Sequence, residues 1–148
     1  MTDPADTPTA APGYELSDDP ARLDRDAVWR FLHEDAYWSK WRDRAVFDGQ
    51  LAVSWRVVGA YQRSTGAQVG FARAISDGFS MAYLADVFVL PEHRGHGLGH
   101  ALVSTMIDDG PGARFRWMLH TADAQGLYMS HGFGEPSMPY LERAARLD

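Results

Sequence analysis

The sequence predicts a mixed α/β fold in which helices flank a mainly antiparallel sheet. Three β-rich segments, residues 51–61, 68–76 and 83–90, are separated only by short turns, which makes them antiparallel neighbours. The third segment leads through a glycine-rich turn into a helical pattern at 98–109. A further β-rich segment, 116–120, follows that helix, and a right-handed crossover places it parallel to the third.

Length and composition fit one soluble globular domain. The chain has 148 residues, of which 45% are hydrophobic and 23% charged, enough for one hydrophobic core. Residues 1–13 are small, polar and rich in proline, so we expect a disordered tail there. Residues 14–148 are expected to form the single domain.

The composition also excludes several classes of protein. The formal net charge is -6 and no basic patch is visible, which disfavours a nucleic-acid partner. No apolar run is long enough to span a membrane, and the N-terminus does not resemble a signal peptide. The absence of cysteine excludes disulfides, thiolate metal sites and a cysteine nucleophile. We therefore expect a cytoplasmic protein with neither a nucleic-acid nor a membrane partner.

The N-terminal third is expected to contain a short edge strand and two helices. The strand is predicted at 14–17. Asp24 is a plausible N-cap for a helix over 24–34, whose apolar face comprises Ala27, Val28, Phe31 and Leu32. A second, shorter helix is predicted at 40–47, with a turn at 48–49 before the strand that starts at 51.

Aromatic residues are unusually frequent between these two helices. Tyr37, Trp38 and Trp41 lie there within five residues. They either cover the core or form the wall of a binding site for a substrate.

The remaining elements follow from turn signals. We predict a hairpin turn at 63–66, and a second turn at 77–78. In the strand between them, Val69, Phe71 and Ile75 are expected to point inward.

Glycine and proline at 110–112 should end the long helix. A short helix is predicted at 123–130, capped by Thr121 or Asp123, and a last strand at 139–143.

The glycine-rich turn has the composition of a phosphate-binding loop. Three glycines alternate with other residues between Arg94 and Gly99, directly before a helix. A helix N-terminus exposes unpaired backbone N–H groups, and glycines let the backbone approach a ligand closely. Such a loop can bind a phosphate or pyrophosphate, with added charge from Arg94 and His96. The alternative is a tight strand-to-helix connection without a ligand.

Three phosphate-binding motifs compete for this loop. A P-loop would need Gly-Lys-Ser/Thr, which is absent. A dinucleotide fingerprint would need its third glycine at the position of His100. The third motif, R/Q-x-x-G-x-G/A, is filled by Arg94, Gly97 and Gly99, after an apolar strand and Pro91. This part of the chain resembles the GNAT acyl-CoA-dependent N-acetyltransferases.

A second motif supports the same resemblance. The pattern A-x-x-L-Y-x-x-x-G-F is filled by Ala124, Leu127, Tyr128, Gly132 and Phe133, about 30 residues after the glycine loop. The resemblance covers about residues 51–133, whereas the N-terminal helices match by position alone.

The resemblance implies both a fold and a reaction. The fold would be a GNAT sheet of six to seven strands, mixed and mainly antiparallel, flanked by about four helices. The reaction would transfer the acetyl group of acetyl-CoA, the co-substrate, to a primary amine by direct attack, without a metal. The acceptor would be a small molecule, an amino-acid-like group or a peptide. A homodimer is compatible with the resemblance. A non-catalytic acyl-CoA-binding module and a nucleotide-binding enzyme remain as alternatives.

The resemblance also assigns residues to roles. Tyr128 would be the general acid that protonates the leaving thiolate, although a buried tyrosine can also serve packing alone. The oxyanion donor would be a backbone N–H among Val87, Phe88 and Val89. The pyrophosphate would be held by the loop residues Arg94, Gly95, His96, Gly97, Leu98, Gly99 and His100. Thr121 occupies a position where many relatives have an asparagine that binds the cofactor arm.

The sequence offers several candidates for the general base. Asp86 could take a proton, directly or through water, or anchor a cationic amine, or form a salt bridge. His120 at the end of the next strand is the second candidate, and His33 and Glu34 are more distant ones. The acceptor pocket is expected to include Tyr37, Trp38, Trp41 and His120.

Overall fold

The computed structural model describes residues 12–36 and 42–146. Its strands are β1 (Tyr14–Ser17), β2 (Arg56–Gln62), β3 (Gln68–Ser76), β4 (Met81–Val89) and β5 (Arg116–Met118). Its helices are α1 (Arg25–Glu34), α2 (Arg44–Val53), α3 (Leu98–Met106) and α4 (Gln125–Met129), with short 3-10 turns at Pro20–Arg22 and Pro91–His93.

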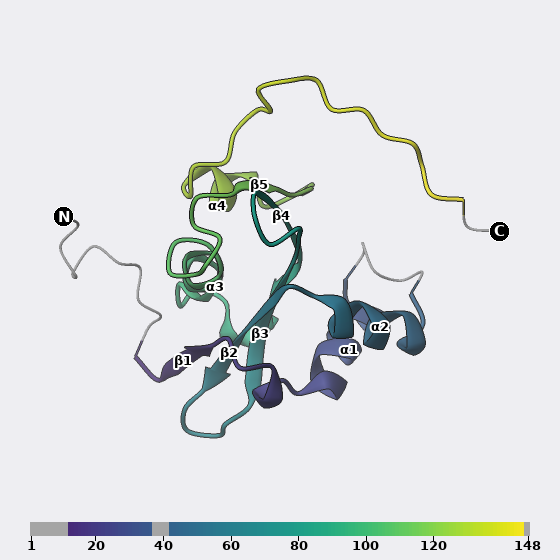
Figure 1. Cartoon of the computed structure of the whole chain (residues 1–148). Coiled ribbons are helices and arrows are strands. Elements are labelled where there is room, and N and C mark those ends of the chain that lie inside the picture. Colours follow the sequence, from purple (N-terminus) through teal and green to yellow (C-terminus); the bar gives the residue numbers. More distant parts are fainter. Residues whose placement is uncertain (1–11, 37–41, 147–148) are drawn as a thin grey trace.

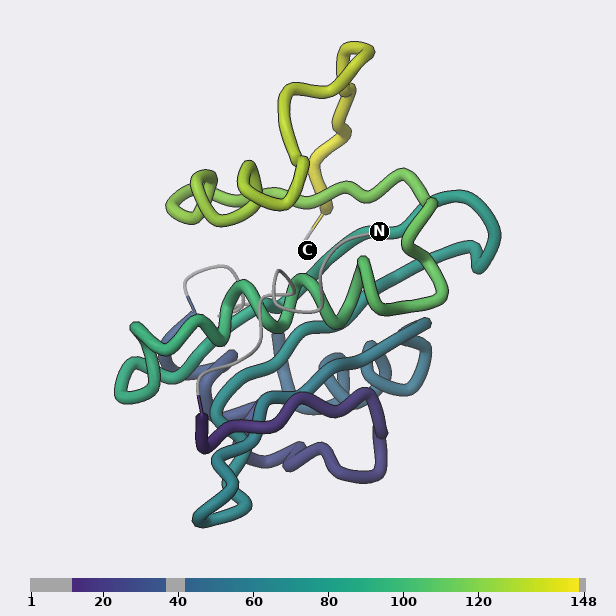
Figure 2. The backbone as a smooth tube through the Cα atoms, turned by 90° about the vertical axis from the view of Figure 1, so that its left-hand side faces the viewer, coloured from purple at the N-terminus to yellow at the C-terminus, as the bar shows by residue number. Residues whose placement is uncertain are grey.

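The strands form one sheet in the order β1-β2-β3-β4-β5. All neighbours are antiparallel except β4 and β5, which are parallel. This confirms the predicted mixed, mainly antiparallel fold. The helices lie on both sides, with α3 on one face of the sheet and α1 and α2 on the other (Figures 1 and 2).

Each face of the sheet has its own hydrophobic cluster. On the α3 face, Leu98, Leu102 and Met106 pack against small and branched residues of β2 and β3. On the α1/α2 face, Phe31 and Phe47 of the helices pack against the sheet. A side chain of the sheet can therefore be assigned to a face by the cluster that it joins.

The N-terminal elements agree with the sequence prediction. The strand at 14–17 lies at the edge of the sheet beside β2. Helix α1 starts after Asp24, whose Oδ1 accepts a hydrogen bond from the Ala27 N–H at 3.0 Å.

The prediction for the next segment was wrong. Helix α2 starts at Arg44, after the N-cap Asp43, and continues to Val53 through the expected turn at 48–49. Phe47 and Leu51, four residues apart on one face of the helix, are both buried, so tertiary packing outweighs the local turn signal. Strand β2 accordingly starts at Arg56 and not at residue 51.

The turns and strand β3 match the prediction in position, with one difference in side-chain burial. Val69 and Phe71 are buried, as expected, but Ile75 is 48% exposed. Burial along β3 ends at Ala74, because the last residues of the strand extend beyond the core.

Strand β4 carries an irregularity at its centre. The register between β3 and β4 shifts between Phe71 and Arg73, and Asp86 has a φ of 57°. Such a bulge re-aims side chains and interrupts regular pairing. Beyond it, β4 runs into the glycine-rich loop and α3.

The C-terminal segment differs from the prediction. No strand is present at 139–143, so the part of the sheet that the structure describes has five strands where six to seven were expected. Pro136 and Pro139 lack a backbone N–H for strand pairing. Met138, Tyr140 and Leu141 are exposed, and the segment arches away from the sheet (Figure 1). Within the described residues, no helix has the length and apolarity needed to cross a membrane.

Candidate active site

The glycine-rich loop places backbone N–H groups without an intrahelical partner at the start of α3. Gly97 is the N-cap with a φ of 74°, and Gly95 has a φ of 84°, conformations that favour glycine. The Ala101 N–H bonds the Gly97 carbonyl at 3.0 Å as the first helical hydrogen bond. The N–H groups of residues 98–100 precede that bond and can face an anion.

Contacts at both ends of the loop hold it in place. The Nε of Arg94 donates to the Val89 carbonyl at 3.0 Å, tying the loop to the end of β4. Gly99 lies against α4, since a Cβ placed there would stand 3.5 Å from the Leu127 side chain. The α3 N-terminus and α4 thus form one packed corner.

Strands β4 and β5 part beside this corner. Within the described chain, β5 pairs with β4 only over Met81–Tyr83. The rest of β4, from Leu84 to Val89, has no hydrogen-bonded partner from β5, and this stretch of β4 beyond the β5 pairing is called the opening below. Val87 and Val89 join the cluster on the α3 face, whereas Phe88 stacks on Phe31 on the opposite face, with ring centroids 4.1 Å apart.

Tyr128 lies on the α3 face of the sheet. It is 8% exposed and belongs to the cluster built around α3. Its ring meets Phe133 edge to face, with centroids 5.9 Å apart. Helix α4 therefore carries this phenol to the side of the opening that the glycine loop occupies.

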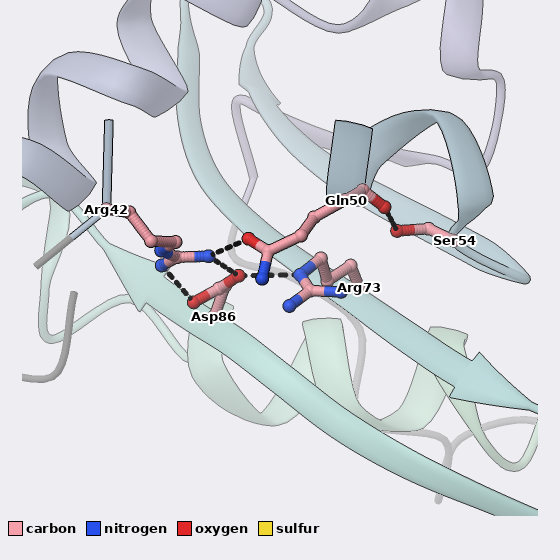
Figure 3. A network of polar contacts seen from close by, with 5 residues as sticks. All are labelled: Arg42, Gln50, Ser54, Arg73 and Asp86. Carbon is pink, nitrogen blue, oxygen red and sulfur yellow. Dashed lines mark hydrogen bonds and ion pairs between the residues drawn. The ribbon is translucent and has the colours of Figure 1, made fainter. Parts of the chain in front are cut away.

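Asp86 lies on the α1/α2 face and is held by two arginines (Figure 3). Arg42 donates to both carboxylate oxygens, at 2.7 and 2.9 Å, and the Nε of Arg73 donates at 2.6 Å. The three side chains are only 3–7% exposed. Arg42 also donates to the Oε1 of Gln50 at 2.7 Å, which connects the group to α2.

These contacts decide how Asp86 can act. Burial raises the pKa of Asp86, but the hydrogen bonds and charges of Arg42 and Arg73 outweigh it, so the pKa is lower than usual. A carboxylate held in this way is a weak proton acceptor at neutral pH. The geometry therefore favours the salt-bridge role that the sequence left open for Asp86.

His120 is brought next to a residue that the sequence did not single out. The phenol oxygen of Tyr83 lies 2.6 Å from the Nδ1 of His120. The His120 ring also meets Tyr140 of the C-terminal segment, with centroids 5.5 Å apart. Burial, followed by the nearby Tyr140 and Asp86, raises the pKa of Tyr83.

Thr121 and His100, both expected to contact the cofactor, have hydrogen-bond partners within the protein. The Thr121 Oγ1 accepts a hydrogen bond from the Ala124 N–H at 3.0 Å, which supports the turn before α4. The Nδ1 of His100 lies 3.0 Å from the Nε2 of His131, at the corner between α3 and α4. Burial and the nearby His100 lower the pKa of His131.

The remaining predicted site residues are placed elsewhere or fall outside the description. Tyr37, Trp38 and Trp41 lie outside the described residues. His33 stacks on Trp29 within α1, with ring centroids 4.8 Å apart.

The residues that sequence reasoning missed are Tyr83 as a partner of His120, and Arg42, Gln50 and Arg73 around Asp86. None of them belongs to a local motif, because their partners are 8 to 44 residues away.

Comparison with known proteins defines the family. Residues 54–135 match the model of the acetyltransferase (GNAT) domain. A Gibberella zeae protein named "Putative acetyltransferase" is 33% identical over 134 residues, covering 78% of this chain and 75% of that protein. The chain therefore belongs to the GNAT acetyltransferase family.

Solved structures agree with this assignment. A "putative acetyltransferase belonging to the gnat family" from Xanthomonas campestris pv. campestris is 38% identical, with a TM-score of 0.84, covering 91% of this chain and 95% of that chain. A "predicted acetyltransferase with acetyl-CoA" from Clostridium acetobutylicum shares the fold, with 13% identity, a TM-score of 0.64, and coverage of 88% and 94%.

Proposed function

We propose that this protein transfers the acetyl group of acetyl-CoA to a primary amine by direct attack. The observation that carries the proposal is the opening between β4 and β5 beside the glycine loop, with Tyr128 on the same face as the loop. The structure of the Clostridium acetobutylicum relative was determined with acetyl-CoA, which supports this co-substrate.

The residues of the loop fit the charged part of acetyl-CoA. The N–H groups of residues 98–100 and the side chains of Arg94 and His100 would face the pyrophosphate. Gly95 and Gly97 leave open space, because a Cβ built at either position meets nothing within 4 Å. The pantetheine arm would then follow the free edge of β4 in the manner of an added strand.

The two faces of the sheet separate the two halves of the reaction. On the α3 face, Tyr128 would protonate the sulfur as the C–S bond breaks. A backbone N–H of Val87, Phe88 or Val89 would stabilise the oxyanion. The amine would approach from the α1/α2 face, where Asp86 and its arginines lie.

The acceptor is proposed as a class only. The candidates are a small-molecule amine, an amino-acid-like amine and the amine of a peptide. Tyr37, Trp38 and Trp41, which lie outside the described residues, are proposed as acceptor-binding residues on the strength of the sequence alone.

Thiol release with a panel of amines tests the proposed reaction. Purified protein would be incubated with acetyl-CoA and, separately, spermidine, L-lysine, an aminoglycoside and a lysine-containing peptide. Acetylation of an amine with stoichiometric thiol release supports the proposal. Tyr128→Phe should reduce this turnover while acetyl-CoA still binds, because it removes a proton donor and little volume.

Two other outcomes would contradict the proposal. Binding of acetyl-CoA without turnover on any amine would indicate a non-catalytic acyl-CoA-binding module. A melting temperature raised by NAD or ATP but not by acetyl-CoA would indicate a nucleotide-binding protein.

A further inference from the structure

Tyr83 and His120 face each other at the point where β4 and β5 part. Tyr83 is the last β4 residue paired with β5, opposite Met118. His120 follows Met118 by two residues, and its Nδ1 lies 2.6 Å from the phenol oxygen of Tyr83. The hydrogen bond therefore spans the two strands where the opening begins.

The pair lies on the face proposed for the acceptor. Successive strand residues point to opposite faces, and Leu84 belongs to the cluster on the α3 face. Tyr83 therefore points toward the α1/α2 face. The charges of Asp86 and Arg73 act on its pKa, which agrees with this placement. Tyr128 and Tyr83 thus lie on opposite sides of the opening.

The two side chains differ in their access to solvent. Tyr83 is half-buried, whereas His120 is exposed. A proton that reaches the phenol can pass through the hydrogen bond to the imidazole, which solvent can reach. Asp86 is poorly suited to this task, because two buried arginines bind its carboxylate.

We propose that Tyr83 and His120 form a proton relay that deprotonates the acceptor amine, with Tyr83 as a catalytic residue and His120 as its link to solvent. This inference rests on the proposed acetyl transfer. It adds Tyr83 to the site and gives His120 a defined partner.

The relay moves one proton from the ammonium group of the acceptor to solvent. One N–H bond of the ammonium group breaks and its proton goes to the Tyr83 oxygen, while the proton of Tyr83 passes to the Nδ1 of His120. The imidazolium then releases one proton to solvent. The neutral amine attacks the thioester carbon, the C–N bond forms and the C–S bond breaks. An ammonium acceptor loses two protons in total. The first goes to solvent through the relay before the attack. The second leaves the nitrogen after the attack and replaces the proton that Tyr128 gives to the thiolate.

Tyr83 needs a partner because its phenol is protonated at neutral pH. Burial, followed by Tyr140 and Asp86, raises its pKa further, with Glu142 adding to the effect and Arg73 opposing it. A protonated phenol can accept a proton only as it gives up its own. The Nδ1 of His120 at 2.6 Å provides the acceptor for that proton.

Kinetics of two variants and a matched control test the relay. Tyr83→Phe keeps the ring and removes the phenol oxygen. His120→Ala removes the imidazole that passes the proton to solvent. Tyr140→Phe is the control, because it removes a neighbouring phenol oxygen while the ring beside His120 remains. The probe amine is the panel member with the fastest thiol release, and acetyl-CoA binding is measured by calorimetry for each protein.

The relay predicts a specific pattern. At pH 7, Tyr83→Phe and His120→Ala each lower kcat/KM by about a hundredfold or more, the typical size of a general-base effect. The double variant is little worse than the more impaired single one, since the two residues act as a unit. The loss in Tyr83→Phe shrinks as the pH approaches the pKa of the amine, about 10.4 for a lysine-like group. Acetyl-CoA binding and Tyr140→Phe activity stay within about threefold of wild type.

Opposite results separate the failure of the relay from the failure of the proposed function. If the wild-type protein turns over and Tyr83→Phe is equally active at pH 7, the relay is overturned and the proposed acetyl transfer stands. A loss in Tyr83→Phe that is the same at every pH also overturns it, because it indicates a structural effect. Wild-type protein that neither binds acetyl-CoA nor releases thiol overturns both.

Discussion

Removing the carboxylate of Asp86 should strongly destabilise the fold. In Asp86→Ala, two guanidinium groups that are 3% and 7% exposed lose the anion between them. Breaking a buried ion pair by removing one partner costs about 3–5 kcal/mol. At about 2–4 °C per kcal/mol for a chain of this size, the melting temperature should fall by roughly 6–20 °C.

Urea unfolding followed by circular dichroism measures this loss. Asp86→Asn is the first companion variant, because it keeps the shape and some hydrogen bonding but removes the charge. The triple replacement Arg42→Met, Asp86→Leu and Arg73→Met is the second, and it should recover much of the stability, since apolar groups of similar volume can replace a buried ion pair. Asp48→Ala, at an exposed i,i+4 pair with Arg44, is the control and should cost less than about 1 kcal/mol.

The same network predicts a pH dependence. The pKa of Asp86 is lower in the folded protein than its ordinary value, so the folded state binds fewer protons at this group. Its contribution to stability is present above the unfolded pKa, about 3.9, and is lost as the pH falls through the folded pKa. The difference in unfolding free energy between wild type and Asp86→Asn should therefore be larger at pH 7 than at pH 3. A loss below 1 kcal/mol in Asp86→Ala, or a difference independent of pH, would refute this reasoning.

Three further predictions concern the acid, the core and a helix cap. Tyr128→Phe should lower kcat, measured by thiol release, by about 10²- to 10⁴-fold with little change in acetyl-CoA affinity. Unchanged turnover would assign Tyr128 to packing alone. Phe88→Ala should cost about 3–5 kcal/mol in urea unfolding, because the buried ring stacks on Phe31; a cost below 1 kcal/mol would contradict the described core. Asp24→Ala should cost about 1 kcal/mol by losing the N-cap bond to Ala27, and Asp24→Asn, which can still cap, should recover most of it in the same measurement.

Much of the fold was predictable because its signals are local. The residues of β3 lie between two clear turns, and the predicted bounds match the structure. The cap at Asp24 and the glycines before α3 also depend on neighbours in sequence. In contrast, the turn signal at 48–49 failed, since burial of Phe47 and Leu51 holds that segment in a helix.

The site divides in the same way. The glycine loop is a continuous motif, so its position before α3 could be predicted. The partners of Asp86 could not, because Arg42 lies 44 residues away and Arg73 lies on a neighbouring strand. Tyr83 and His120 are 37 residues apart and meet only through the parallel pairing of β4 and β5. Contacts set by register across a sheet leave no local pattern in a single sequence.

Isothermal titration with acetyl-CoA tests the central claim most directly. Wild-type protein should bind at micromolar concentrations, and Gly97→Glu should abolish binding by placing a bulky negative charge at the N-cap of α3. Gly78→Glu is the matched control, since Gly78 also has a positive φ, 82°, but lies in the turn between β3 and β4. Loss of binding in Gly97→Glu alone, with both variants folded, is the predicted result. Absence of binding in folded wild-type protein, or equal binding by all three, would contradict the account.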